Sequence, residues 1–429
     1  MIEVADIFRR FADEYLSAHG ASMPPSHRRA IADIKACRTE ALGGRLWRCD
    51  QGSAEIFSYH SCKNRSCPKC HTRQTERWLE GRKAEMLPVP YFHVTVTAPE
   101  ELREVLRANQ RDGYALLMKA AAEAILELAR DQRYVGATVG VLAVLHTWTQ
   151  QLLYHPHIHC LVTGGGVSDD GRCWRGARHA FLVPVKASAR LVRGKLRAAF
   201  RKERPDLVLP KAAWAKPWVV HCAPWGQGEQ AALNYLARYV FRVAITNTRI
   251  VGFEDQAVVI RYKQRKSNRW RACRMPGQEF MRRFLQHVLP KGLHKVRYFG
   301  LWHPAKREDA GRARLLLNLD PSAKPRPVER RADAVDPPKS RRRRDSALAA
   351  VPAFSIWSAS FLPSRPKDHD VRTPLGRQPN PGSLSHAPSM PRPLIVRRSP
   401  THRSTAQNRR PHSHPRSSHR RNNAAAAAA

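Results

Sequence analysis

The segment His155-Pro156-His157-Ile158-His159-Cys160-Leu161-Val162 decides how the centre of this chain is expected to fold. Polar and apolar residues alternate along it, which is the pattern of a β-strand with one buried face. Alternation sends His157 and His159 to one face and Ile158 to the other. Pro156 has no N–H and suits the first position of a strand, which leaves His155 at the margin. The segment therefore predicts a core strand that presents two neighbouring imidazoles.

Neutral imidazole binds divalent metals, so His157 and His159 are candidate ligands of a cation. The alternative is two polar residues on the wet face of a strand, since the chain has 20 histidines. His155 shares the same face by parity, and only its marginal position favours the other two as ligands.

Further elements surround this strand. Glycines 164–166 are expected to end it, and a Cys-rich loop segment is expected to run up to about His71. Alternation predicts other strands, and apolar residues at helical spacing predict helices. The predicted strands are Tyr91 to Thr97, Gly140 to Trp148, and a hairpin of Ala257 to Lys263 with Trp270 to Met275; the predicted helices are Val4 to His19, Glu101 to Arg130, Ala189 to Arg201, Gln230 to Arg242 and Gln278 to Leu289. Short strands interleaved with helices indicate an α+β domain around a mostly antiparallel sheet.

Tyr235 and Tyr239 lie four residues apart in one predicted helix, so both phenols point from the same face. A phenol is a poor nucleophile at neutral pH, but a nearby cation and Arg side chains favour its phenolate. The alternative is an aromatic stripe that packs on the sheet. A cation that polarises a phosphodiester and a tyrosine that attacks its phosphorus together suffice to nick a strand without water.

The charge of the chain points to a polyanionic partner. It carries 75 Lys and Arg against 35 Asp and Glu, a net charge of +40. Residues 321–429 hold 22 Lys and Arg, 6 Asp and Glu and 17 of the 32 prolines, so this segment is expected to be disordered and the rest still carries +24. Nucleic acid is the expected partner. No signal peptide, lipidation motif or long apolar run is visible, so a cytoplasmic location without a membrane is expected.

Five of the nine cysteines lie between Cys37 and Cys70, and such crowding favours a metal site over disulfides. Cys62, Cys67 and Cys70 supply three thiolates close together. Cys49 is the expected fourth ligand of a tetrahedral zinc site, with His60, His71 and Cys37 in reserve.

Several linked motifs in one order resemble the HUH endonuclease superfamily, and within it the two-tyrosine, rolling-circle insertion-sequence transposases with an N-terminal zinc-binding domain. The resemblance covers residues 5–305. It is carried by His157-Ile158-His159 ahead of the Tyr235 and Tyr239 helix, and by Cys37-Arg38-Thr39, Ala41 to Gly44, Ser61 to Cys70, Leu87 to His93, Pro156 to Cys160 and His287 to Gly292.

The resemblance implies a fold and an activity. A zinc-binding module at 1–85, an HUH nuclease domain with a central antiparallel sheet at 86–310 and a basic tail at 311–429 are expected. The expected activity is cleavage of single-stranded DNA at element ends, with Mg²⁺ or Mn²⁺ at His157, His159 and an unidentified third group. Tyr235 is the expected first nucleophile and Tyr239 its partner, although the sequence does not settle their order. The product would be a 5′-phosphotyrosine and a free 3′-hydroxyl.

Basic and aromatic side chains near these motifs are expected to contact DNA, by phosphate contacts and base stacking. They are Lys63, Arg65, Lys69, Arg238, Lys263, Arg265 and Trp270. For those on the hairpin, a solvated face without DNA contact is an equal alternative. No small-molecule substrate is expected. Two alternatives share these features: a DNA-binding protein without chemistry, and a replication initiator or relaxase with the same catalytic parts.

Overall fold

The computed structural model describes residues 2–49, 55–70, 78–178, 180–240, 242–264, 267–321 and 354–355. The segment expected to be a disordered tail therefore lies almost wholly outside the described residues, as do His71 and Arg265.

The N-terminal part consists of two helices and a hairpin. Helix α1 (Val4–His19) is followed by α2 (Pro25–Ala36), and then by β1 (Gly44–Cys49) and β2 (Glu55–Tyr59). These strands pair antiparallel, and β12 (Phe354–Ser355) pairs with β1 on the other side. The segment expected to be a loop up to His71 thus contains a helix that the sequence analysis missed. Only three of its residues are buried, which left its period weak.

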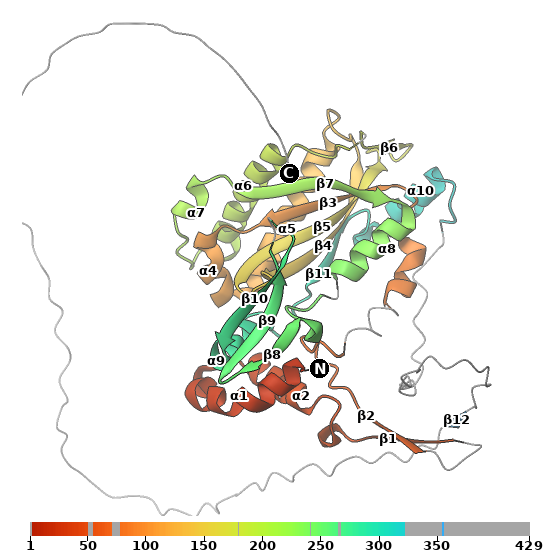
Figure 1. The fold of residues 1–429 in the computed structure, drawn as a ribbon. Coiled ribbons are helices and arrows are strands. Elements are labelled where there is room, and N and C mark those ends of the chain that lie inside the picture. Colours follow the sequence, from red (N-terminus) through yellow and green to blue (C-terminus); the bar gives the residue numbers. More distant parts are fainter. Residues whose placement is uncertain are drawn as a thin grey trace, which may run out of the picture. The chain divides into compact units, whose positions relative to one another are not determined.

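The central sheet has six strands, of which five run in the order β11-β4-β5-β3-β7 while β6 pairs with β5 (Figure 1). All of these pairings are antiparallel. The strands are β3 (Pro90–Thr97), β4 (Thr138–Trp148), β5 (Tyr154–Val167), β6 (Trp174–Gly176), β7 (Val219–Gln227) and β11 (Val296–Gly300). The predicted α+β fold with a central antiparallel sheet is confirmed.

The other predicted helices and the predicted hairpin are present with shifted ends. The remaining helices are α4 (Arg103–Ala108), α5 (Gln110–Arg130), α6 (Val185–Glu203), α7 (Ala212–Ala215), α8 (Gly228–Tyr239), α9 (Gly277–Leu285) and α10 (Arg307–Leu316), and a second sheet is formed by β8 (Ile250–Glu254), β9 (Ala257–Lys263) and β10 (Trp270–Pro276). The predicted helix Glu101 to Arg130 is divided into α4 and α5, and α7, α10 and β8 were not predicted. Short 3-10 turns link several of them: η1 (Gly20–Ser22), η2 (Glu40–Leu42), η3 (Lys83–Glu85), η4 (Glu100–Leu102), η5 (Asn247–Arg249) and η6 (Pro304–Lys306).

Strand β5 continues through the glycines that were expected to end it. Its last residues pair with β4 and β6. A Cβ on Gly166 would lie 2.1 Å from the Thr138 carbonyl oxygen, and one on Gly165 would lie 2.7 Å from the Trp174 ring. These positions require glycine because neighbouring strands approach the backbone too closely for a Cβ. The glycines therefore do not end the strand.

The two faces of the central sheet are covered by different helices. Ile158 and Cys160 of β5 pack in one core with residues of α5 and α6, whereas Leu161 packs in another with residues of α8. Alternation along β5 therefore places His157 and His159 on the face that α8 covers. The sequence pattern predicted this division, and α8 is the helix that carries the two tyrosines.

The N-terminal helices share a core with a distant part of the chain. Phe8 of α1 and Ile31 of α2 are buried with Ile260 of β9 and Phe284 of α9. The Phe8 and Phe284 rings meet edge to face, with centroids 5.1 Å apart. Residues 1–85 thus do not bury their apolar faces by themselves.

Among the described helices, none combines the length and the apolar composition that a membrane crossing requires.

Candidate functional site

Three imidazoles meet on the sheet face that α8 covers. His157 and His159 of β5 are joined by His146 of β4, and their nearest ligand atoms all lie within 4.8 Å of one another. The strand register places His146 directly opposite His157. Three converging nitrogen donors are a recurrent ligand set for a divalent cation, with further coordination positions left open. His155 lies outside this group, and its Nδ1 is 3.2 Å from the Arg103 guanidinium.

In each of the three rings, one nitrogen takes part in a hydrogen bond and the second nitrogen remains for a metal. His157 Nδ1 donates to the His155 carbonyl at 2.7 Å, and His146 Nε2 donates to the Tyr239 carbonyl at 2.8 Å. His159 Nδ1 lies 2.9 Å from Nε2 of His93 on β3. Such outer hydrogen bonds fix ring orientation and leave the opposite nitrogen for a metal. The arrangement fits a cation held by Nε2 of the β5 pair and Nδ1 of His146.

Burial keeps these imidazoles neutral. Desolvation, helped by neighbouring His and Arg charges, lowers the pKa of His159 to about 2. Desolvation likewise lowers the pKa of His157 to about 4 and that of His146 well below its usual range. A metal ligand must be the unprotonated ring, so near pH 7 all three are in the form that binds.

His146 and His93 were not identified from the sequence. His146 falls within a predicted strand, but only the β4–β5 register shows which of its faces meets the histidine pair. His93 lies diagonal to His159 across the β3–β5 pairing, in which Thr95 is opposite His159. The sequence could have indicated these two histidines only if the neighbours of the histidine strand had been known. Side chains of alternate residues on those neighbouring strands would then have been expected on the same face as His157 and His159.

Tyr235 and Tyr239 share one face of α8, as their spacing predicted, and differ in their surroundings. Their ring centroids are 4.7 Å apart. The Tyr239 ring lies 4.3 Å from that of His159 and its residue is 8% exposed. Tyr235 is 0% exposed, and its hydroxyl is buried without a hydrogen-bond partner. Burial therefore raises the pKa of Tyr235 well above 10.

Arg238 places a positive charge beside the second tyrosine. Its guanidinium carbon lies 5.8 Å from the centre of the Tyr239 ring and 5.9 Å from that of Trp225. The same charge contributes to the low pKa of His93 and His159, after burial. A cation so close to the centre can offset negative charge on a phosphate or a phenolate.

Four thiols form a second cluster, made of Cys37, Cys62, Cys67 and Cys70. The Sγ atoms of Cys37 and Cys70 are 3.5 Å apart, and the other close pairs are at 3.6 Å. A tetrahedral site with Zn–S bonds of about 2.3 Å needs sulfurs separated by about 3.8 Å. The cluster therefore fits zinc.

Cys37 takes the place that the sequence analysis assigned to Cys49. Cys37 follows the last residue of α2, whereas Cys49 ends β1. The hairpin register places Gly44 at the cluster end, opposite Tyr59. Cys49 is five residues further along, about 17 Å at the rise of a strand, and its side chain lies outside the described residues. The described residues thus group Cys37, one of the reserve ligands, with Cys62, Cys67 and Cys70, while the role of Cys49 stays a prediction.

The basic residues near the thiols make contacts within the protein. The Arg65 guanidinium donates to the carbonyls of Leu289, Pro290 and Leu293 at 2.6–2.7 Å. Lys69 forms an ion pair with Glu3. The side chains of Arg65 and Lys69 thus have partners within the protein. The sequence had indicated only contacts with DNA phosphates for them. Lys63 is exposed, with a positive φ of 53°.

The hairpin of β9 and β10 presents the predicted aromatic and basic side chains. Trp270 is 55% exposed, and the Arg261 guanidinium lies 5.1 Å from its ring centre. Lys263 pairs with Trp270 in the strand register, and its backbone N–H donates to Gln150 Oε1 at 2.8 Å. An exposed indole beside cations suits base stacking next to a phosphate chain.

Comparison with known proteins places the chain in a family. A family model described as "Putative transposase" matches residues 140–310, and another described as "Transposase zinc-binding domain" matches residues 7–98. "Putative transposase y4qJ" of Sinorhizobium fredii is 41% identical over 331 residues, which cover 71% of this chain and 81% of that protein. The chain belongs to the family of rolling-circle insertion-sequence transposases.

A second transposase is more distant. The "Transposase for insertion sequence element IS801" of Pseudomonas savastanoi pv. phaseolicola is 25% identical over 286 residues, which cover 63% of this chain and 68% of that protein. No solved structure matches the chain. The four clustered thiols fall within the zinc-binding match, and the three imidazoles and both tyrosines fall within the transposase match. This transposase is therefore an enzyme that acts on DNA.

Proposed function

We propose that this transposase nicks single-stranded DNA at the ends of its element through a covalent tyrosine intermediate. The observation that carries the proposal is the contact of the Tyr239 ring with the His146, His157 and His159 group. When bound there, a divalent cation would polarise a phosphodiester and neutralise charge in the transition state. Of Mg²⁺ and Mn²⁺, a set of three nitrogen donors favours Mn²⁺, because Mg²⁺ prefers oxygen ligands.

The nicking step exchanges one phosphate ester for another. The phenol oxygen forms a bond to phosphorus and loses its proton, while the bond from phosphorus to the 3′-oxygen breaks and that oxygen leaves as a hydroxyl. The product is a 5′-phosphotyrosine with a free 3′-end. Because the ester energy is conserved, a 3′-hydroxyl on another strand can later displace the tyrosine and complete strand transfer.

Tyr239 is the better candidate for the first attack, which reverses the order expected from sequence. Its residue keeps 8% exposure, its ring lies against that of His159, and the Arg238 guanidinium lies beside it. The hydroxyl of Tyr235 is sealed from solvent, and burial disfavours its phenolate. Tyr235 must therefore move before it can react, which suits the holding of a second strand end.

The single-strand path is proposed to include the β9–β10 hairpin. Trp270 offers an exposed ring for stacking, and Arg261 and Lys263 flank it in the paired strands. Stacking on an aromatic ring tolerates any base, so this surface would hold the strand while other contacts select the site.

The test is to incubate the purified full chain with single-stranded oligonucleotides from the element ends and Mn²⁺, and then to measure SDS-resistant protein–DNA adduct. We expect adduct from the wild type and from Tyr235→Phe, at least a 100-fold loss in Tyr239→Phe, and a similar loss in His146→Ala. Tyr134→Phe and the exposed His294→Ala serve as matched controls and should react normally.

Two outcomes would contradict the proposal. The first is DNA binding by the wild type without any adduct, which would favour a DNA-binding protein without chemistry. The second is an undiminished adduct after both tyrosines are replaced by Phe. Loss of the adduct in Tyr235→Phe but not in Tyr239→Phe would restore the order expected from the sequence.

A further inference from the structure

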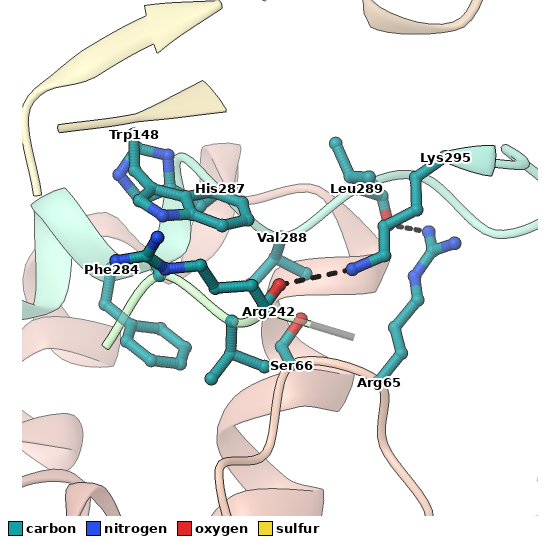
Figure 2. A pocket seen from close by; sticks show the side chains of 11 residues that line it. Arg65, Ser66, Trp148, Arg242, Phe284, His287, Val288, Leu289 and Lys295 are labelled. Atoms are coloured by element: carbon teal, nitrogen blue, oxygen red, sulfur yellow. Dashed lines mark hydrogen bonds between the residues drawn. The ribbon is translucent and has the colours of Figure 1, made fainter. Parts of the chain in front are cut away.

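A small pocket lies beside the imidazole group, between the segment that carries the thiols and the segments that follow α8 and α9. It has a volume of about 40 Å³. Arg65, Arg242 and Lys295 contribute positive charge to its lining. Figure 2 shows the Lys295 ammonium at the backbone carbonyl of Arg242, with Arg65 next to it, while the Arg242 side chain extends toward Trp148 and Phe284. A water needs about 10–15 Å³ by this kind of measure, so the space holds about three waters or one group of phosphate size.

The pocket is lined by basic side chains and by no carboxylate. Its lining contains no Asp or Glu. Within the described part of the chain, neither Lys295 nor Arg242 forms an ion pair with a carboxylate. The Lys295 ammonium donates to the Arg242 carbonyl at 3.2 Å, which satisfies one of its three N–H groups.

The surroundings of these cations favour the binding of an anion. Burial, together with the charge of Arg65, lowers the pKa of Lys295 to about 8. Desolvation by the surrounding chain also lowers the pKa of Arg242, although its side chain is exposed at the mouth of the pocket. The Arg242 side chain is exposed and that of Lys295 is half-buried, so an anion that enters the pocket can reach both cations and form charge-assisted contacts.

The pocket adjoins the proposed nicking centre through one aromatic ring. Trp148 lines the pocket and stacks on His146, with ring centroids 4.5 Å apart and planes at 22°. On its other side the Trp148 ring meets that of His287 at 6.0 Å. The charge of Arg242 also contributes to the low pKa of His157 and His159, after burial. A strand bound at the imidazoles would thus have its next phosphate close to the pocket.

We infer that this pocket is a subsite for a single backbone phosphate of the DNA strand, adjacent to the phosphate that is attacked, with Lys295 and Arg242 as its binding groups. The inference rests on the proposed function, which brings the strand to the imidazoles. Arg65 lies on the thiol-bearing segment and donates to carbonyls of the segment that follows α9. It therefore holds these two walls of the pocket together.

The salt dependence of DNA binding tests the subsite without any chemistry. The full chain is titrated with a fluorescent single-stranded 20-mer at several salt concentrations and without divalent metal. The loss of one phosphate contact lowers the slope of log K against log salt by about 0.7 for single strands. We expect this decrease in Lys295→Met, together with weaker binding at low salt. Lys295→Arg keeps the charge and should retain most of the slope.

The matched control is Arg190→Gln, which removes one positive charge from an exposed position on α6. It should leave the slope unchanged. Equal slopes for wild type and Lys295→Met, or equal losses in Lys295→Met and Arg190→Gln, would overturn the inference. The salt titration measures binding only, so its result is independent of the adduct assay. If the wild type forms the adduct but Lys295→Met keeps the wild-type slope, the subsite is refuted and the proposed chemistry stands. A reduced slope without any adduct would refute the proposed chemistry alone.

Thermal unfolding of the same variants separates binding from structure. Lys295 faces Arg65, Arg242 and His287, and its lowered pKa means that the folded state disfavours the charged ammonium. This destabilisation is fully present below about pH 8 and is removed as the pH rises toward the unfolded value of about 10.4. Lys295→Met should therefore melt higher than wild type at pH 7, with the difference shrinking by pH 10. A lower Tm for Lys295→Met at pH 7 would assign the lysine a structural role and overturn the inference.

Discussion

His93 is the residue that connects the imidazole group to the tyrosines. Its Nε2 lies 2.9 Å from His159 Nδ1 and 3.0 Å from Thr95 Oγ1. Its ring centroid is 5.4 Å from that of Tyr235 and 5.1 Å from that of Tyr239. One ring therefore orients a proposed metal ligand and packs against both proposed nucleophiles, so His93 is a positioning residue.

Replacement of His93 by Ala should lower the affinity for Mn²⁺ by about 10- to 100-fold, the usual effect of removing an outer hydrogen-bond partner of a metal ligand. Isothermal titration of the full chain with Mn²⁺ measures it. His93→Gln keeps a polar group at the position and should recover part of the affinity. If His93→Ala binds Mn²⁺ as the wild type does, its contact with His159 has no bearing on the metal.

At the same scale, the two tyrosines show what spacing alone can predict. The interval of four residues places both rings on one face of α8, because helical geometry depends only on the local backbone. It does not show that the Tyr235 hydroxyl is sealed while the Tyr239 residue keeps 8% exposure. That difference depends on where α8 meets the sheet.

At the scale of elements, the alternation along β5 carries most of the site. It was predictable because a strand places successive side chains on opposite faces. Strand β7 was missed because most of its residues are half-buried or exposed, which gives no clear alternation. Strand β11 was missed because all five of its residues are half-buried.

The glycines near the end of β5 give a prediction at this scale. A Cβ at position 166 would lie 2.1 Å from the Thr138 carbonyl oxygen, which is backbone and cannot rotate away. Gly166→Ala should therefore destabilise the fold by about 3 kcal/mol, the upper range for overpacking. Chemical denaturation measures the change. Gly176→Ala on β6 is the matched control, since nothing lies within 4 Å of a Cβ there. Similar stability of the two variants would show that the β4–β5 contact is looser than described.

At the scale of the whole chain, the N-terminal helices and the second sheet share one buried core. Cys37 and Cys67 are buried in the same core as Ile260 of β9 and Phe284 of α9. The expected boundary at residue 85 therefore does not separate two independent cores. Apolar residues on α1 and α2 are too few to form a core alone, and they find their partners more than 200 residues along the chain.

This shared core predicts a distant effect of zinc removal. Chelation should loosen the thiol cluster and, through the core, increase amide hydrogen exchange in α9 at least several-fold. Exchange in α6, which packs in a different core, should change little. Mass spectrometry of both peptides before and after chelation measures this. Equal exchange in α9 with and without chelator would show that the thiols do not support the second sheet.

The sequence by itself determined the features that local geometry controls. Strand alternation placed His157 and His159 together, helical spacing paired Tyr235 with Tyr239, and crowding indicated a metal site among the cysteines. Only the tertiary structure decided that His146 is the third imidazole and that Cys37 completes the thiol cluster. It also decided that the Tyr239 ring lies against that of His159 while the Tyr235 hydroxyl is sealed from solvent. Strand order and helix packing set these contacts, and both arise from burial of apolar surface between segments far apart in the chain.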